Sequence, residues 1–274
     1  MRGVRLAVNV IVLAGTLLTV TPVAAENFDH SFLAYAGVLS RFVDTIRVDY
    51  AALRDDRAQL DDVVASLDAP LAGGEPSWSR YQRMAFWINA YNAFTLQVIV
   101  DYYPIRSGWF TLLPRNSIRQ IDGVWTDLRW RAAGRDLTLD DIEHGILRSE
   151  FRDPRIHFAI NCASIGCPPL ASQPYRAETL DAQLDEAART YLAIPEGLRD
   201  DGDDFLVSSI LDWYGDDFVE RFAPAIPGDR HPKERAILGV IAVYGPAALS
   251  ARAKTGRPGI RFLDYNWSLN DTAR

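Results

Sequence analysis

The chain has 274 residues, of which 48% are hydrophobic and 24% charged, with a formal net charge of −7. This composition excludes an intrinsically disordered protein, and the acidic balance disfavours general binding to nucleic acid or docking on an anionic membrane. The length allows one domain with a full hydrophobic core. The only lysines are Lys233 and Lys254, which leaves little room for lysine chemistry.

Residues 1–25 have the pattern of a secretory signal peptide. Two arginines precede an apolar stretch, residues 6–20, which is short for a membrane-spanning helix of about 20 residues. The small residues that end at Ala25 fit a cleavage site. We therefore expect the mature protein to begin at Glu26, to be periplasmic or secreted, and to have no stable membrane insertion; an uncleaved anchor is the weaker alternative.

Residues 26–274 are predicted to form one α+β domain, mainly helical, with a small, short-stranded sheet. Helical spacing of apolar residues predicts helices over residues 28–42, 51–67 and 80–101, and residues 43–50 are expected to be extended. Apolar residues surround most of the 80–101 segment, so we expect it to be the central buried helix. Asn89 and Asn92 share one of its faces. Because buried amides need hydrogen-bond partners, they either tie a loop to the helix or orient a site histidine.

The second half of the chain alternates helical and short extended patterns. Thr138 and Asp141 form a capping box, which predicts a helix over residues 139–147. Further helices are expected over residues 180–192, 209–222 and 233–244. Strands are expected at residues 125–131, 156–160 and 259–267, and a hairpin over residues 198–207 with a Gly202 turn.

The segment from Asn161 to Leu170 is the most informative in the chain, because it holds both cysteines, Cys162 and Cys167, in a Gly/Ser/Pro loop. A thiol there can be a nucleophile, a metal ligand or half of a disulfide. Export favours oxidising surroundings and thus a Cys162–Cys167 disulfide. A reactive thiol and an inert buried thiol are the alternatives.

Five segments resemble, in order, the hallmarks of the domain of unknown function 547 (DUF547) family. They are Phe86–Ala93 (FWINAYNA), Asp141–Arg148 (DIEHGILR), Asp153–Pro168, Asp212–Phe218 (DWYGDDF) and Tyr265–Asn270 (YNWSLN). The resemblance extends from about residue 30 to the C-terminus. Members of this family are exported bacterial proteins or parts of larger plant proteins, and with the signal pattern the resemblance implies an exported bacterial member. It supplies no established activity, so function must be argued from the residues.

The sharpest hypothesis is a cysteine-dependent hydrolase or acyl transferase that acts on an amide or ester of an unknown small molecule or peptide. Cys162 would be the nucleophile, His144 the base, and Asn89 or Asn92 the residue that orients the imidazole, as in papain-like enzymes. The other residues expected at the pocket are Asn92, Glu143, His157, Asn161 and Ser164.

Two other classes of function stay open. One is a non-catalytic binding or scaffolding module, with a structural disulfide and aromatic pairs such as Trp213-Tyr214 along a groove. The other is a metal site, although neither C-x-x-C nor H-E-x-x-H spacing is present. Its possible ligands are Glu143, His144, His157, Cys162 and Cys167. No phosphate loop or dinucleotide fingerprint occurs, so no cofactor is expected.

Overall fold

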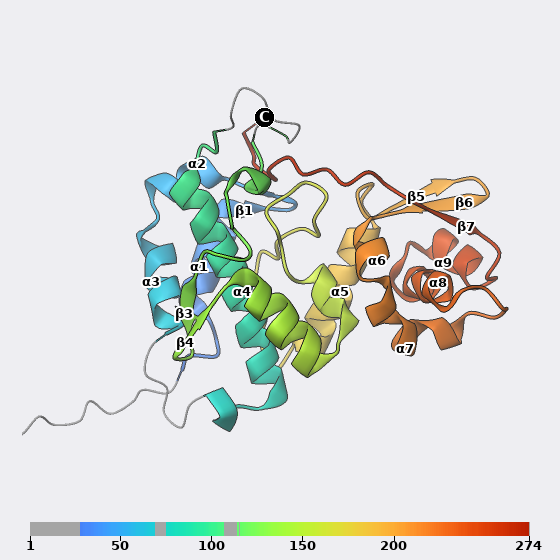
Figure 1. The fold of residues 1–274 in the computed structure, drawn as a ribbon, viewed down its shortest axis with the longest axis horizontal. Coiled ribbons are helices and arrows are strands. Elements are labelled where there is room, and N and C mark those ends of the chain that lie inside the picture. Colours follow the sequence, from blue (N-terminus) through green and yellow to red (C-terminus); the bar gives the residue numbers. More distant parts are fainter. Residues whose placement is uncertain (1–27, 69–74, 107–113, 115, 274) are drawn as a thin grey trace, which may run out of the picture.

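The computed structural model describes residues 28–68, 75–106, 114 and 116–273. The predicted signal peptide, residues 1–25, lies outside the described residues. The described part of the chain is a mainly helical α+β fold with three small sheets, which confirms the predicted fold class (Figure 1).

The N-terminal helices pack around one long buried helix, α4. They are α1 (Leu33–Phe42), α2 (Tyr50–Asp55), α3 (Ala58–Ser66) and α4 (Arg80–Tyr102), with η1 (Glu75–Ser77) just before α4. A capping box between Ser79 and Gln82 starts α4, and its residues 84–96 are buried without interruption. The prediction of a central buried helix is confirmed.

Two predictions for the residues before α4 need correction. The segment expected to be extended, residues 43–50, is a tight hairpin of β1 (Val43–Asp44) and β2 (Arg47–Val48). The helix expected over residues 51–67 is two helices, because Asp56 leaves the helical conformation at the end of α2. A continuous apolar face does not reveal such a break.

The middle of the chain holds η2 (Ile118–Gln120), the hairpin of β3 (Trp130–Ala132) with β4 (Arg135–Leu137), and two unusual helices. The first is η3 (Asp141–Phe151), a π-helix. Thr138 and Asp141 exchange backbone-to-side-chain hydrogen bonds of 3.0 Å at its start, which confirms the capping box. The strand expected at residues 125–131 begins only at Trp130.

The strand predicted at residues 156–160 is wrong. The segment is η4 (Pro154–Phe158), a 3₁₀-helix. The Asp153 side chain accepts a hydrogen bond from the Arg155 backbone N–H, and Pro154 occupies the first turn. An Asp cap followed by Pro is a helix-start signal, and here it prevails over the short apolar run.

The C-terminal elements form a second unit around α8. They are α5 (Leu180–Leu192), β5 (Leu198–Asp201), β6 (Asp204–Val207), α6 (Ile210–Trp213), η5 (Gly215–Phe218), α7 (Val219–Phe222), η6 (Ala223–Ala225), α8 (Pro232–Tyr244), α9 (Ala247–Ala253) and β7 (Gly259–Phe262). The β5–β6 hairpin is confirmed, and β7 pairs parallel to β6. The helix expected over residues 209–222 is broken into three short pieces, and α9 was not predicted.

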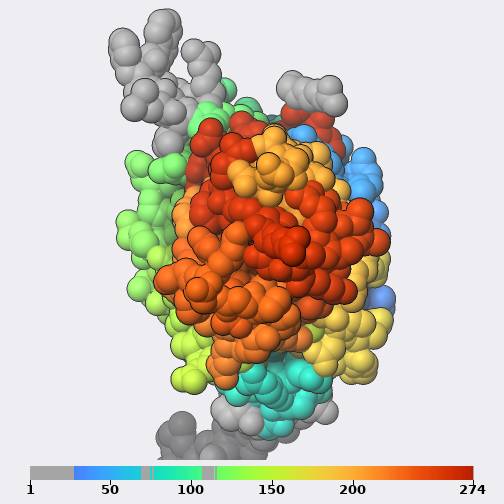
Figure 2. Space-filling model, turned by 90° about the vertical axis from the view of Figure 1, so that its right-hand side faces the viewer, coloured from blue at the N-terminus to red at the C-terminus, as the bar shows by residue number. Residues whose placement is uncertain are grey.

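The buried apolar side chains of the described residues form two clusters, one around α4 and one around α8. Figure 2 shows the C-terminal part from outside, where its orange and red atoms form one continuous face.

After β7 the chain runs back across the molecule towards α2 (Figure 1). We call this return, residues 263–273, the closing segment; Val48 pairs with Asp271 in it. Among the described residues, no helix has the length and apolarity to cross a membrane.

Candidate functional site

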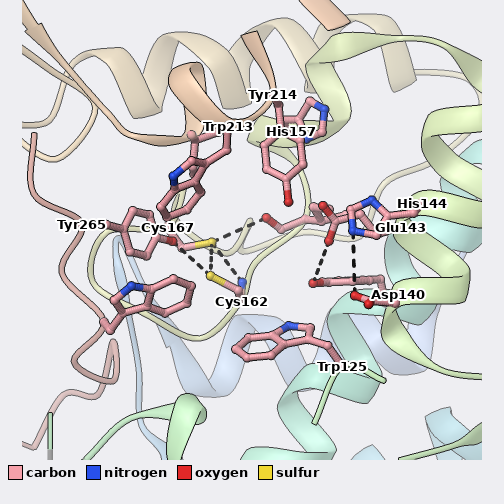
Figure 3. A pocket seen from close by; sticks show the side chains of 14 residues that line it. Trp125, Asp140, Glu143, His144, His157, Cys162, Cys167, Trp213, Tyr214 and Tyr265 are labelled. Atoms are coloured by element: carbon pink, nitrogen blue, oxygen red, sulfur yellow. Dashed lines mark hydrogen bonds and ion pairs between the residues drawn. The ribbon is translucent and has the colours of Figure 1, made fainter. Parts of the chain in front are cut away.

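A cavity of about 350 Å³ lies where the two apolar clusters meet (Figure 3). Tyr91 and Ile160 of the α4 cluster and Ile210 of the α8 cluster contribute to its wall. Cys162 and Cys167 also line it, so we call it the thiol cavity. Its other walls come from η3 and from the closing segment.

The loop that carries the two cysteines, residues 161–168 (the Cys loop), is folded back on itself by the Asn161 side chain. Asn161 Oδ1 accepts the Ala163 N–H at 2.8 Å, and Asn161 Nδ2 donates to the Pro168 carbonyl at 2.7 Å. Ala163 has φ 57°, a left-handed conformation that is costly for a residue other than glycine. The loop therefore holds a strained shape that places Cys167 beside Cys162.

Both cysteines are free thiols in this structure, and their sulfurs are 3.0 Å apart. Cys162 Sγ also lies 3.2 Å from Ser164 Oγ and 3.1 Å from the Tyr265 hydroxyl. The hydrogen bond from Cys167 lowers the pKa of Cys162 most, Ser164 and Tyr265 lower it further, and burial opposes them. Burial raises the pKa of Cys167 well above its ordinary value. Of the two thiols, Cys162 is thus the one that ionises more readily. The Cys162–Cys167 disulfide expected from the sequence stays a prediction.

The closing segment fixes the Cys loop from one side. Ile165 N–H donates to the Ser268 carbonyl at 2.8 Å, and Gly166 N–H donates to the Asn266 carbonyl at 2.9 Å. A Cβ on Gly166 would lie 3.0 Å from the Asn266 nitrogen and 3.1 Å from the Tyr265 ring. Glycine therefore permits the close approach that brings the Tyr265 hydroxyl to the thiol.

Asn92, but not Asn89, supports the site. Asn92 Oδ1 accepts the Asn161 N–H at 2.8 Å, and Asn92 Nδ2 donates to the Ala159 carbonyl at 3.0 Å. Asn89 instead exchanges hydrogen bonds of 2.8 and 2.9 Å with the backbone of Tyr175. It neither lines the thiol cavity nor contacts an imidazole, so its contacts are those of a structural anchor.

His144 lies on the wall of the thiol cavity opposite the sulfurs, half-exposed (Figure 3). Its Nδ1 is 3.1 Å from an Arg148 nitrogen, and its Nε2 is 3.8 Å from Asp140 Oδ1. Because a guanidinium only donates, Nδ1 accepts, and the proton of the neutral ring is on Nε2. Burial raises the pKa of Asp140, and nearby His144 partly offsets this.

His157 is buried and serves a supporting role. Its Nε2 lies 2.8 Å from Asp217 Oδ2, and its ring stacks on Tyr214 at 4.0 Å. Burial would raise the pKa of Asp217, but hydrogen bonds from His157 and Arg148 bring it below the usual range. The ionised carboxylate thus holds the imidazole against Tyr214.

Neither imidazole contacts the thiol. In the part of the chain that the structure describes, the hydrogen-bond partners of Cys162 Sγ are Cys167, Ser164 and Tyr265. The Cys-His contact of papain-like enzymes, which the sequence analysis proposed for His144, is therefore not formed. Hydrogen bonds from other side chains take its place in stabilising the thiolate.

The two ends of the thiol cavity differ in character. Close to the sulfurs, aromatic rings pack together: Tyr265 lies 4.5 Å from Trp267 and 4.9 Å from Trp213 between ring centroids. Towards η3, Glu143 is buried and accepts a hydrogen bond of 3.3 Å from Tyr91, next to His144. A bound molecule therefore meets an apolar wall at one end and ionisable groups at the other.

Sequence reasoning gave no site role to Tyr265, Trp267 or Asp217. A signal existed, because Asp212–Phe218 and Tyr265–Asn270 were recognised as family-like segments. The metal alternative finds no support in geometry: among the described residues, no group of three or more His, Cys, Asp or Glu is arranged to hold an ion.

Comparison with known proteins gives one match. Residues 76–192 match the family model described as "Protein of unknown function, DUF547". The DUF547 match contains α4, η3 and the Cys loop, and it supports the resemblance noted in the sequence. The closing segment lies beyond it. No curated protein and no solved structure matches the chain. Since DUF547 carries no assigned activity, the geometry must carry the functional argument.

The lowered pKa of Cys162 predicts unusual alkylation behaviour. In the reduced protein, reaction of Cys162 with iodoacetamide should persist to lower pH than that of an ordinary thiol, because its thiolate persists there. Tyr265→Phe removes one hydrogen bond to the thiolate and should move the midpoint of the alkylation profile to higher pH. Cys162→Ser is the control. Its remaining thiol, Cys167, is buried, so alkylation at low pH should be lost. A wild-type midpoint at or above that of free cysteine would contradict this reading.

Proposed function

We propose that the protein is a cysteine-dependent hydrolase or acyl transferase that acts on an amide or ester. The observation that carries the proposal is a thiol whose pKa is lowered by hydrogen bonds and which opens onto a cavity of about 350 Å³. A stabilised thiolate in a cavity with ionisable groups on the far wall is the arrangement that nucleophilic catalysis needs.

The proposed reaction begins with the Cys162 thiolate. It attacks the substrate carbonyl carbon, forming a C–S bond and moving the carbonyl π electrons onto oxygen. The Tyr265 hydroxyl, 3.1 Å from the sulfur, is placed to donate a hydrogen bond to that oxygen. Collapse of the intermediate breaks the C–N or C–O bond, and the leaving amine or alcohol takes a proton from the imidazolium form of His144.

The second half returns the enzyme to its starting state. Water, or another nucleophile in an acyl transferase, attacks the thioester and gives its proton to neutral His144. The C–S bond breaks, and Cys162 is again a thiolate. The leaving atom is bonded to the carbonyl carbon beside Cys162, whereas His144 lies on the opposite wall (Figure 3). This division of roles therefore requires a bridging water that carries the proton between His144 and the reacting group.

The test is to trap the covalent intermediate. Reduced protein is incubated with a panel of activated esters and anilides that carry short, long and aromatic acyl groups, then quenched in acid and mapped by mass spectrometry. An acyl adduct on Cys162 that hydroxylamine removes is the expected result. Acylation elsewhere, or none across the panel, would count against the proposal.

A non-catalytic binding module is the second candidate, and one observation favours it. The aromatic rings of Trp213, Tyr265 and Trp267 pack together at the cavity and form an apolar surface on which a ligand can stack. Binding there would not require the Cys-His contact, which is not formed. In the trapping experiment this function would appear as a ligand that protects Cys162 from alkylation without acylating it.

We also propose that the protein is exported and cleaved after Ala25. Secreted or periplasmic material should begin at Glu26 in N-terminal mass spectrometry, because small residues precede that bond. As a control, Ala25→Lys should block processing and leave a larger, membrane-associated species. Recovery of the chain from the cytoplasm with residues 1–25 attached would refute the prediction.

A further inference from the structure

We propose that Cys162 and Cys167 form a redox-active dithiol that exchanges with disulfides, with Cys162 as the attacking and Cys167 as the resolving cysteine. This activity goes beyond the proposed acyl chemistry and does not depend on it. It rests on the arrangement of the two sulfurs and of the loop that holds them.

The two cysteines are placed asymmetrically. Cys162 is partly exposed, whereas Cys167 is only 6% exposed, with its sulfur 3.0 Å from that of Cys162. An incoming disulfide therefore meets Cys162 first. The hydrogen bonds around Cys162 favour its thiolate, which is the form that attacks a disulfide sulfur.

A backbone hydrogen bond favours the second step, in which Cys167 attacks the mixed disulfide on Cys162. The Cys162 N–H donates to Cys167 Sγ at 3.0 Å, so it stabilises a thiolate on Cys167 at the moment when that sulfur must attack. The same hydrogen bond holds Cys167 against the residue that would carry the mixed disulfide. Resolution then needs no movement of a distant cysteine.

The Cys loop holds the two sulfurs close together. Asn161 ties its two ends together, and Cys167 N–H donates to the Ser164 carbonyl at 3.1 Å. The sulfurs are 3.0 Å apart and must approach by about 1 Å to reach bonding distance. Because this approach is small, we infer that the loop alternates between the dithiol and the disulfide.

The proposed exchange takes place in two steps. The Cys162 thiolate attacks a substrate disulfide R–S–S–R′, forming a mixed disulfide with R and releasing R′S⁻. Cys167 loses its proton to solvent and attacks Cys162 Sγ, which releases RS⁻ and forms the Cys162–Cys167 disulfide. Two electrons pass from the dithiol to the substrate disulfide. A low-molecular-weight thiol reverses both steps.

The experiment is an equilibrium titration with glutathione, which involves no acyl substrate. Purified protein is equilibrated in mixtures of reduced and oxidised glutathione, quenched in acid, alkylated and mapped by mass spectrometry. We expect one reversible transition from two alkylated cysteines to a Cys162–Cys167 cross-link. Cys167→Ser should lose the cross-link and accumulate glutathione on Cys162, whereas Cys162→Ser should lose both the cross-link and rapid mixed-disulfide formation.

Three outcomes would overturn the inference. They are a wild-type mixed disulfide on Cys162 that never resolves, first reaction at Cys167, and a cross-link that glutathione cannot reduce in the folded protein, which would be a structural disulfide. If either variant fails to fold, as judged by circular dichroism, the wild-type titration still decides. A reversible glutathione transition without acylation by any ester or anilide would support the redox dithiol and count against the hydrolase. Acylation of Cys162 without a reversible transition would support the hydrolase and overturn the redox dithiol.

Discussion

Replacement of Cys162 by alanine is expected to lower turnover of an ester or amide substrate about 10³-fold or more, because the proposed reaction forms its covalent bond at this sulfur. The neighbouring hydroxyls cannot take its place: Ser164 donates to Tyr265 at 3.0 Å, and burial keeps the pKa of Tyr265 well above its ordinary value. Initial rates on any substrate that acylates the wild type provide the measurement.

Ser164→Ala is the matched control for this prediction. It removes the hydroxyl that donates to Tyr265, whose own hydroxyl lies 3.1 Å from the sulfur, but it leaves the sulfur in place, so the expected loss is roughly 10-fold. Both variants should retain the wild-type circular dichroism spectrum. A Cys162→Ala protein that kept a tenth or more of the wild-type rate would show that catalysis takes place elsewhere.

Replacement of Asn92 by alanine is expected to lower the free energy of unfolding by about 2–4 kcal/mol. The change leaves the Asn161 N–H and the Ala159 carbonyl without their buried partner, and it opens a small void in α4. Since Asn161 in turn shapes the Cys loop, rapid alkylation of Cys162 should also be lost. Chemical denaturation and alkylation kinetics measure the two effects.

Asn89→Ala provides a control on the same face of the same helix. It also removes two hydrogen bonds from a buried backbone segment, here at Tyr175, so the loss of stability should be similar. Alkylation of Cys162 should stay close to wild type, because Asn89 does not contact the Cys loop. Equal loss of thiol reactivity in both variants would mean that general destabilisation, and not loop positioning, is responsible.

The elements that the sequence predicted well are those with strong local signals. The period of apolar residues identified α4, the capping box at Thr138 identified the start of η3, and Gly202 identified the β5–β6 turn. The strand predicted at residues 156–160 failed because a short apolar run fits a strand and a buried helical turn equally well. There the Asp153-Pro154 start signal should have had more weight.

The candidate site was predicted only as far as its local segments. Cys162, Glu143 and His144 line one cavity, and Ser164 lies beside the Cys162 sulfur. Asn89 and Asn92 share a residue type and a helix face, so only the loops packed against them decide which one reaches the site. Tyr265 follows Cys162 by 103 residues, and no pattern within a single sequence specifies that pairing.

The closing segment also sets the order in which the reactive centre matures. Cys162 gains its hydrogen bond from Tyr265 only after the chain has been extended through that residue and has folded back over the Cys loop. A chain synthesised only as far as the Cys loop lacks that donor, and its thiol is correspondingly less ionised. Full stabilisation of the Cys162 thiolate therefore requires the chain to be folded through Tyr265.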